Sequence, residues 1–332
     1  MALRIIPFED YYIKEKCVLT CVSYEDRSKL VLEKILDTKK ITSCVLIKLS
    51  DLFEDKKPIT TLSSKNEDDL VRESWINNYN EIRDLLTRNN INLIEIEGSS
   101  SDIFSLAKKI SDALPVDEKI LFDISSFPKY LLLEILRWNE NKKFICIYAR
   151  PGIEREAETE FSIGTKGIGV LKGFEGSIRF DRVNIMVLIL GFEGARALTV
   201  FKHFEPAKVF AFLGNSLGFF STTTNEFYID NAKRNNSQLL SNQRVIIDEI
   251  SALDPYSVKE KLDLTISNYS SKNDANIIIS CLGTKPQTLG LFIYWLQNKH
   301  VQIIYSTPSK RRISSKGVGP IWVYKIKELL HE

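Results

Sequence analysis

Two short loops in this 332-residue chain place hydroxyl, lysine and proline residues together, a combination that suits anion binding. They are residues 125–129 (SSFPK) and residues 283–286 (GTKP). Proline fits the first turn of a helix, where its missing N–H costs nothing. Free N–H groups at a helix start, the helix dipole, a hydroxyl and a lysine can together hold a phosphate. The alternative is that both loops only cap helices. The candidate ligand contacts are Ser125, Ser126, Lys129, Gly283, Thr284 and Lys285.

A second pair of loops follows the first apolar run of each half of the chain. Ser23 and Glu25 lie in one loop, and Gly191 and Glu193 lie in the other. A carboxylate there could act as an acid, a base or a metal ligand, or could simply favour the positive end of a helix dipole. Asp123 is a further candidate, but its counterpart in the second half is a serine, so a symmetric pair of catalytic carboxylates is not expected.

Two glycine-containing segments each begin with a hydroxyl and a lysine. Residues 165–169 (TKGIG) resemble residues 315–319 (SKGVG). Either segment could be a plain tight turn. The other interpretation is a basic loop that closes over a bound ligand, with Lys166 and Lys316 as its cations.

These segments belong to two halves of the chain that resemble each other in sequence. Residues 120–151 align without gaps on residues 277–308, and eight of the 32 positions are identical. A second block, residues 17–32, matches residues 185–200, and the blocks occur in the same order in each half. The period far exceeds that of a solenoid repeat, so we interpret it as a tandem duplication of one domain.

The apolar runs predict the same order of elements in both halves. Short runs that are apolar on both faces are typical of parallel strands covered by helices. The predicted strands are 17–23, 44–49, 92–97, 119–124, 143–149, 184–191, 208–213, 245–249, 276–281 and 301–305. The predicted helices are 26–37, 67–89, 102–113, 129–138, 194–204, 227–242, 255–270 and 286–297.

The predicted fold class is therefore α/β, with two tandem Rossmann-like domains, each a mainly parallel sheet with helices on both faces. We expect a first domain at 1–151, a glycine-rich β extension at 152–183 and a second domain at 184–332. The β-prone tracts after the last strand of each half are expected to form β-hairpins.

Composition limits the classes of function. Lys plus Arg total 45 and Asp plus Glu total 43, so no global basic field favours long nucleic acid. The five cysteines form no C-x-x-C pair and the three histidines are widely spaced, so we expect buried thiols and no metal site. The first residues lack a signal-peptide pattern, and the apolar runs are too short to cross a bilayer, so we expect a cytoplasmic protein.

Common cofactor and nucleophile motifs are missing. The sequence has no Walker phosphate loop, no G-x-G-x-x-G after the first strand of either half and no G-x-S-x-G elbow. No cofactor is therefore predicted.

The loop Leu282-Gly283-Thr284-Lys285-Pro286 resembles the Gly-Thr-Lys loop of CRISPR-associated Rossmann-fold (CARF) domains. The tandem layout resembles the related SAVED sensors, which carry two such units. The resemblance implies binding of a cyclic oligonucleotide by loops after strands 1 and 4, around a pseudo-two-fold axis, in prokaryotic antiviral signalling. The first half has a serine pair where that loop carries its glycine.

Three functions follow as expectations. The favoured one is a regulatory sensor that binds a nucleotide or cyclic oligonucleotide in a pocket shared by facing halves and passes the signal to a partner protein. A phosphodiesterase acting on the same ligands is the second. The third is a non-catalytic adaptor, for which aromatic residues would mark a protein interface, namely Phe219, Phe220, Trp322 and Tyr324.

Overall fold

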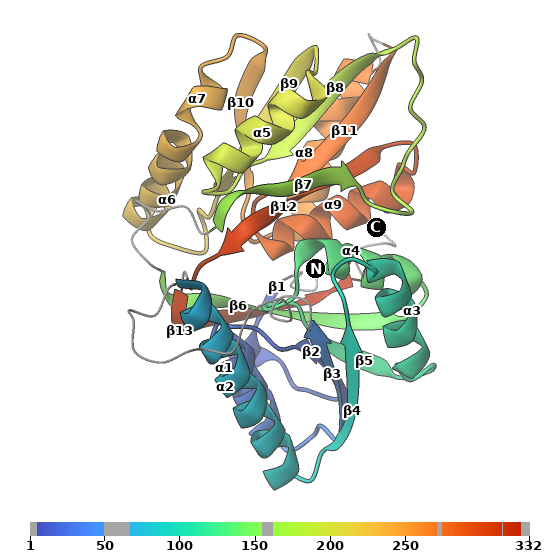
Figure 1. The fold of residues 1–332 in the computed structure, drawn as a ribbon, viewed down its shortest axis with the longest axis vertical. Helices are drawn as coiled ribbons and strands as arrows, with labels where there is room; N and C mark the ends of the chain where they lie inside the picture. Colours follow the sequence, from blue (N-terminus) through green and yellow to red (C-terminus); the bar gives the residue numbers. More distant parts are fainter. Residues whose placement is uncertain (1–4, 50–66, 155–161, 271–273, 314, 327–332) are drawn as a thin grey trace. The chain divides into compact units, whose positions relative to one another are not determined.

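The computed structural model describes residues 5–49, 67–154, 162–270, 274–313 and 315–326. The chain forms two compact units. Unit 1 comprises Met1–Arg155 together with Arg312–Glu332, and unit 2 comprises Glu156–Arg311. Each unit is built on one sheet (Figure 1).

Unit 1 holds a seven-stranded sheet in the order β1-β13-β6-β5-β2-β3-β4. The strands from β4 to β6 are parallel, while β13 and β1 add antiparallel pairs at one side. The strands are β1 (Ile5–Pro7), β2 (Cys17–Cys21), β3 (Ser43–Leu49), β4 (Asn92–Gly98), β5 (Lys119–Asp123), β6 (Lys143–Glu154) and β13 (Ser315–Lys325). The helices are η1 (Phe8–Asp10), α1 (Arg27–Leu36), α2 (Glu67–Arg88), α3 (Ile103–Ala113) and α4 (Lys129–Trp138).

Unit 2 repeats this plan in a six-stranded sheet of order β10-β9-β8-β11-β12-β7. Only the pair of β7 with β12 is antiparallel. The strands are β7 (Ser162–Val170), β8 (Val183–Ile189), β9 (Lys208–Asn215), β10 (Val245–Ser251), β11 (Ala275–Cys281) and β12 (Gln302–Arg311). The helices are α5 (Gly194–Phe204), α6 (Thr222–Asn235), α7 (Ser237–Leu240), α8 (Pro255–Ser270) and α9 (Lys285–Gln297).

The predicted α/β fold class is confirmed, because two sheets of mostly parallel strands alternate with helices. The central strands are buried on both faces, as their unbroken apolar runs require. In unit 1, side chains of α1 and α2 pack on one face of the sheet; in unit 2, side chains of α5, α6 and α7 do the same. Because the central strands run parallel, all their carboxyl ends lie at one edge of each sheet.

The extension strands depart from the expected hairpins. β7 follows β6 in the chain but pairs with β12, and β13 follows β12 but pairs with β6. The chain therefore leaves unit 1 after β6, forms unit 2, and returns to complete the first sheet. We call β7 and β13 the exchanged strands, because each pairs with the last parallel strand of the other half of the sequence. The second unit consequently ends at Arg311 rather than at the C-terminus that the sequence interpretation gave it.

The pairing register also corrects the alignment of the two glycine-containing segments. Ser162 lies opposite Arg311 and Ser315 lies opposite Glu154, two positions that the 157-residue offset of the duplication makes equivalent. Ser162-Ile163-Gly164 therefore corresponds to Ser315-Lys316-Gly317, and both glycines have a positive φ, of 62° and 70°. Lys166 and Lys316 are not counterparts.

Smaller differences have local causes. The helix expected at 227–242 is two helices, because Asn236 is at once the C-cap of α6 and the N-cap of α7. α6 also begins earlier than expected, after the Ser221 cap. Trp322 and Tyr324 are buried in the core of unit 1, so they cannot mark the protein interface that the adaptor interpretation expected. β1 pairs with β13 and was not predicted.

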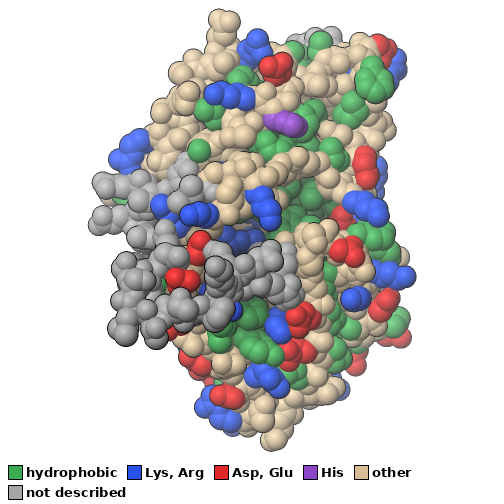
Figure 2. Space-filling model, in the orientation of Figure 1, with side chains coloured by type: hydrophobic (Ala, Val, Ile, Leu, Met, Phe, Trp, Pro, Cys, Tyr) green, Lys and Arg blue, Asp and Glu red, His purple; other side chains and the backbone are tan. Residues whose placement is uncertain are grey.

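The described part of the chain contains no helix with both the length and the apolar character needed to span a bilayer. On the face drawn in Figure 2, Lys and Arg side chains are interspersed with Asp and Glu. That mixture agrees with the near balance of charges in the sequence.

Because β13 pairs with β6, a core substitution in β13 should destabilise unit 1 and not unit 2. Val323 is fully buried among side chains of β2, α1 and β6. Val323→Ala should lower the unfolding free energy of unit 1 by about 2 kcal/mol through lost burial and a residual cavity. Hydrogen exchange should accelerate in β2 and β5 and stay unchanged in β8 and β11.

Val200→Ala is the matched control, because Val200 is equally buried in the core of unit 2. It should produce the opposite pattern. Acceleration in β8 and β11 by Val323→Ala would contradict the assignment of β13 to the first sheet.

Candidate functional site

The candidate site of each unit lies where the strand order reverses. In unit 1 the order places β2 beside β5, and in unit 2 it places β8 beside β11. Ligands of open parallel sheets bind at the carboxyl ends of the strands at such a position. We call the segment after the first of these strands the first loop (residues 22–26 or 190–193). The segment after the other is the second loop (residues 124–128 or 282–284).

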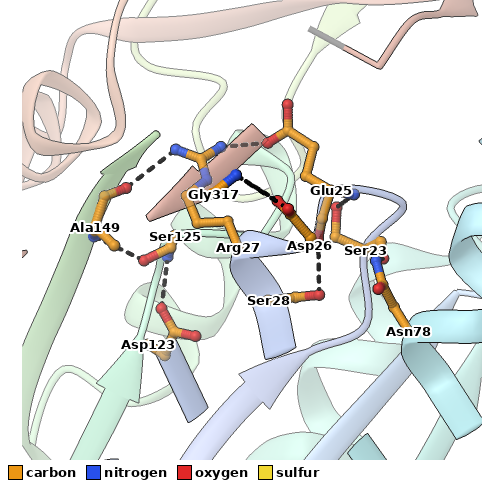
Figure 3. A network of polar contacts seen from close by, with 10 residues as sticks. All are labelled: Ser23, Glu25, Asp26, Arg27, Ser28, Asn78, Asp123, Ser125, Ala149 and Gly317. Atoms are coloured by element: carbon orange, nitrogen blue, oxygen red, sulfur yellow. Dashed lines mark hydrogen bonds and ion pairs between the residues drawn. The ribbon is translucent and has the colours of Figure 1, made fainter. Parts of the chain in front are cut away.

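A buried arginine holds the first loop of unit 1 to the last parallel strand. Arg27 donates from Nη2 to the Glu25 carboxylate, with which it forms an ion pair, and from Nη1 to the carbonyl oxygen of Ala149 in β6 at 3.0 Å (Figure 3). Arg27 and Glu25 are both more than nine-tenths buried. Burial disfavours the Arg27 cation, but nearby Glu25 more than compensates and the pKa of Arg27 is raised. A buried pair of this kind fixes geometry because neither charge can be left alone.

The second loop of unit 1 is tied to the same residue of β6. The Ser125 hydroxyl accepts a hydrogen bond from the Ala149 N–H at 2.8 Å. Asp123 accepts from the Ser125 N–H at 3.0 Å and from the Thr20 hydroxyl at 3.1 Å. Burial raises the pKa of Asp123, although the hydrogen bonds from Ser125 and Thr20 and the charge of Arg27 oppose the shift. Arg27 and Ser125 therefore hold the two loops at Ala149, and Asp123 links the second loop to β2 through Thr20.

The exchanged strand β13 joins this network. The Gly317 N–H lies 3.0 and 3.1 Å from the two carboxylate oxygens of Asp26 (Figure 3). Asp26 occupies the N-cap position of α1 but makes no side-chain cap hydrogen bond there. Contacts of Asp26, Arg27 and Ser125 thus bring the first loop, the second loop and the segment containing Lys316 into one cluster.

Unit 2 has a similar buried arginine, but at a different distance in sequence from its glutamate. We call this arrangement, an arginine that pairs with the first-loop glutamate and donates to the last parallel strand, the arginine clamp. Arg196 pairs with Glu193 and donates to both the hydroxyl and the carbonyl of Ser306, with Nε at 3.2 Å from the hydroxyl oxygen. Ser306 is the counterpart of Ala149 at the 157-residue offset. Arg196 stands three positions after its glutamate, whereas Arg27 stands two positions after Glu25.

The sequence analysis missed both arginines, because at the 168-residue offset Arg27 aligns with Ala195 and Arg196 lies one position further on. A signal was present in the sequence, since the glutamate that both first loops share, Glu25 or Glu193, has an arginine within one helical turn of it.

Glycine lets the two loops of unit 2 approach each other closely. A Cβ on Gly191 would lie 2.5 Å from the carbonyl oxygen of Leu282, and one on Gly194 would lie 1.8 Å from that of Asn235. A Cβ on Gly283 would lie 2.0 Å from the Gln287 side-chain oxygen. These glycines are therefore required by close packing, of the first loop against the second at Gly191, of the start of α5 against the end of α6 at Gly194, and of the second loop against its own helix at Gly283.

Thr284 has a clear structural role. Its hydroxyl accepts from the Gln287 N–H at 3.3 Å and donates to the Ala252 carbonyl at 2.5 Å. Gln287 completes a capping box by accepting from the Thr284 N–H at 2.7 Å. The capping interpretation of the loop therefore holds for Thr284, whose hydroxyl is engaged on both sides.

The remaining predicted residues fall into three places. Lys129 and Lys285 are the first residues of α4 and α9. Lys166 is exposed at the bulge in β7, in unit 2, while Lys316 is exposed beside Gly317, in unit 1. Ser23 accepts from the Glu25 N–H at 3.3 Å, and the Ser126 hydroxyl is buried without a hydrogen-bond partner among the described residues.

Metal and thiol chemistry find little support in the described residues. They contain no group of three or more His, Cys, Asp or Glu side chains that could hold a metal ion. All five cysteines are buried, and burial raises the pKa of Cys44 and Cys146, which keeps these thiols protonated. The loops can supply backbone N–H groups, hydroxyls and lysine cations.

Comparison with solved structures shows a likeness in fold. A type III CRISPR defence DNA nuclease activated by cyclic oligoadenylate superposes with a TM-score of 0.55 at 8% identity. The match covers 87% of this chain and 65% of that protein, so this chain spans less than two thirds of its length. The likeness shows a shared fold.

Other comparisons add no family. An MccF-like protein from Streptococcus pneumoniae, solved with AMP, gives a TM-score of 0.19 at 9% identity, covering 96% of this chain and 98% of that one, and this score carries no argument. Neither protein-family profiles nor curated protein sequences match the chain.

The arginine clamp of unit 1 predicts a large loss of stability when Glu25 is removed and Arg27 is kept. Glu25→Ala leaves Arg27 buried without its counter-charge, so unit 1 should lose about 3–5 kcal/mol. Equilibrium unfolding monitored by hydrogen exchange in β2 and β6 measures the loss. The exposed pair of Lys29 with Glu81 is the control, and Glu81→Ala should cost less than about 1 kcal/mol. Equal costs for the two variants would show that the buried pair does not hold the loops.

Proposed function

We propose that the protein is a defence-associated sensor that binds a phosphorylated nucleotide through the strand-end loops of its units. The observation that carries the proposal is the lysine at the start of the helix after each second loop. α4 begins with Lys129 and α9 with Lys285, and neither helix has an acidic residue in its first turn. A lysine beside the free N–H groups and the positive dipole end of a helix can add a charge-assisted contact to a phosphate bound there.

The position of the loops supports the same proposal. Each pair of loops lies where the strand order reverses, which is the ligand position of open α/β sheets. In unit 2, Gly191 allows the first loop to pack directly against the backbone of Leu282, so the two loops lie side by side. Backbone N–H groups at the start of the helix that follows can bind a phosphate.

A cyclic oligonucleotide is the ligand we propose first. The solved protein with the same fold is described as activated by cyclic oligoadenylate. The tandem duplication gives this chain two copies of the loop set, which suits a ligand with repeated phosphates. Binding would signal to a partner protein.

A non-catalytic adaptor is the second candidate. The capping box of Thr284 favours it, because a loop whose hydroxyl is consumed by the fold needs no ligand. On that account Lys285 and Lys129 are surface residues with structural roles only.

Calorimetric titration of the full chain with a panel of mononucleotides and cyclic oligoadenylates tests the proposal. Lys285→Ala and Lys129→Ala should each weaken binding about tenfold, because each removes a charge-assisted contact to phosphate. Lys109→Ala is the control, since Lys109 lies exposed on α3, away from both loops.

Three results separate the candidates. Saturable binding that depends on both helix-start lysines supports the sensor. Binding followed by ligand cleavage, seen by chromatography, would make the protein a phosphodiesterase. Absence of heat across the panel from folded protein would contradict nucleotide binding and favour the adaptor.

A further inference from the structure

The contact between Asp26 and Gly317 is unusual for an aspartate at a helix start. Such a residue normally accepts a hydrogen bond from the second or third N–H of its own helix. Asp26 makes no such bond and instead places both oxygens 3.0–3.1 Å from the N–H of a residue 291 positions away. The carboxylate therefore behaves as an anion bound to the exchanged strand.

The segment that receives this carboxylate has the features of an anion site. Gly317 has φ of 70° and nothing lies within 4 Å of the position of its missing Cβ, so the space beside it is open. Backbone N–H groups around a left-handed residue form concavities that bind anions. Lys316 adds an exposed cation next to this N–H.

Two buried polar atoms near the contact have no hydrogen-bond partner among the described residues. They are the Ser315 hydroxyl, two residues before Gly317, and Nε of Arg27, the residue after Asp26. Both side chains are at least nine-tenths buried. Unsatisfied buried donors cost free energy, which a ligand oxygen or a water molecule could recover.

Unit 2 lacks the carboxylate at the corresponding place. Asp26 corresponds to Gly194 at the 168-residue offset that aligns β2 with β8. Gly194 has no room for a side chain, because a Cβ would collide with the backbone of Asn235. Gly164, the counterpart of Gly317, keeps the same left-handed conformation.

We infer that Asp26 is a built-in competitor for an anionic group of the ligand at the Gly317 N–H, which makes unit 1 the weaker of two unequal anion sites. The inference rests on the proposed function and names the residue that distinguishes the units. The chemical class it concerns is a phosphate or phosphodiester oxygen. The ligand must displace the carboxylate to engage unit 1, whereas unit 2 has Gly194 in place of Asp26 and the neutral Ser309 hydroxyl beside Gly164.

Glycine-selective ¹⁵N labelling of the full chain gives a direct readout. The chain has 15 glycines, and the Gly317 resonance is assigned by its disappearance in Gly317→Ala. The probe is inorganic phosphate. In Asp26→Asn the Gly317 resonance should shift at phosphate concentrations about tenfold lower than in the wild type, because the substitution removes the competing charge and the repulsion of an anion.

Two control variants test whether the effect is specific to the carboxylate of Asp26. Asp112→Asn removes one exposed acidic charge on α3 and should leave the phosphate response as in the wild type. Asp26→Gly reproduces the residue of unit 2 and should behave like Asp26→Asn, while the other glycine resonances report that the fold is intact.

The outcomes separate this inference from the proposed function. A Gly317 resonance that phosphate moves equally in Asp26→Asn and in the wild type, or moves in neither, overturns the role of Asp26. If the nucleotide titration still shows binding, the sensor function stands without it. If phosphate moves Gly317 as expected but no nucleotide binds, the competitor is real and the nucleotide proposal fails.

Discussion

The rest of each unit's candidate site depends on one interaction, a buried arginine that joins an acidic first loop to the last parallel strand. Arg27 does this with Glu25 and Ala149, and Arg196 does it with Glu193 and Ser306. Charges buried to this degree must be paired, so the interaction restricts how far the first loop can move from the sheet.

The exchanged strands give the duplication a physical consequence. The strand that completes the sheet of unit 1 is encoded at the end of the chain, and the strand that completes the sheet of unit 2 is encoded immediately after β6. The sheet of unit 1 is therefore incomplete until the C-terminal segment is in place, and the sheet of unit 2 is incomplete without the segment that follows β6. Through Asp26 and Gly317, the C-terminal strand also contacts the first loop of unit 1.

Most of the helices and strands were predictable, because local patterns determine them. Parallel strands such as β2, β8 and β11 are short apolar runs whose bounds the structure reproduces within a few residues. The partner of β13 was not predictable in this way, since an apolar extension strand reads the same whether it pairs with β12 or with β6. The register error between Lys166 and Lys316 has a similar origin, because the matching letters lie three positions away from the matching backbone conformations.

The candidate site was predictable in its location and less so in its chemistry. Strand order places the loops at the sheet edge, whereas the roles of Ser125 and Thr284 as internal hydrogen-bond partners depend on distant residues. Hydrogen exchange of the full chain with and without a cyclic oligoadenylate tests the central claim most directly. The account predicts slowed exchange in residues 22–26, 124–130, 190–196 and 282–288. Slowed exchange confined to the edge strands β4 and β10, with these loops unchanged, would contradict it.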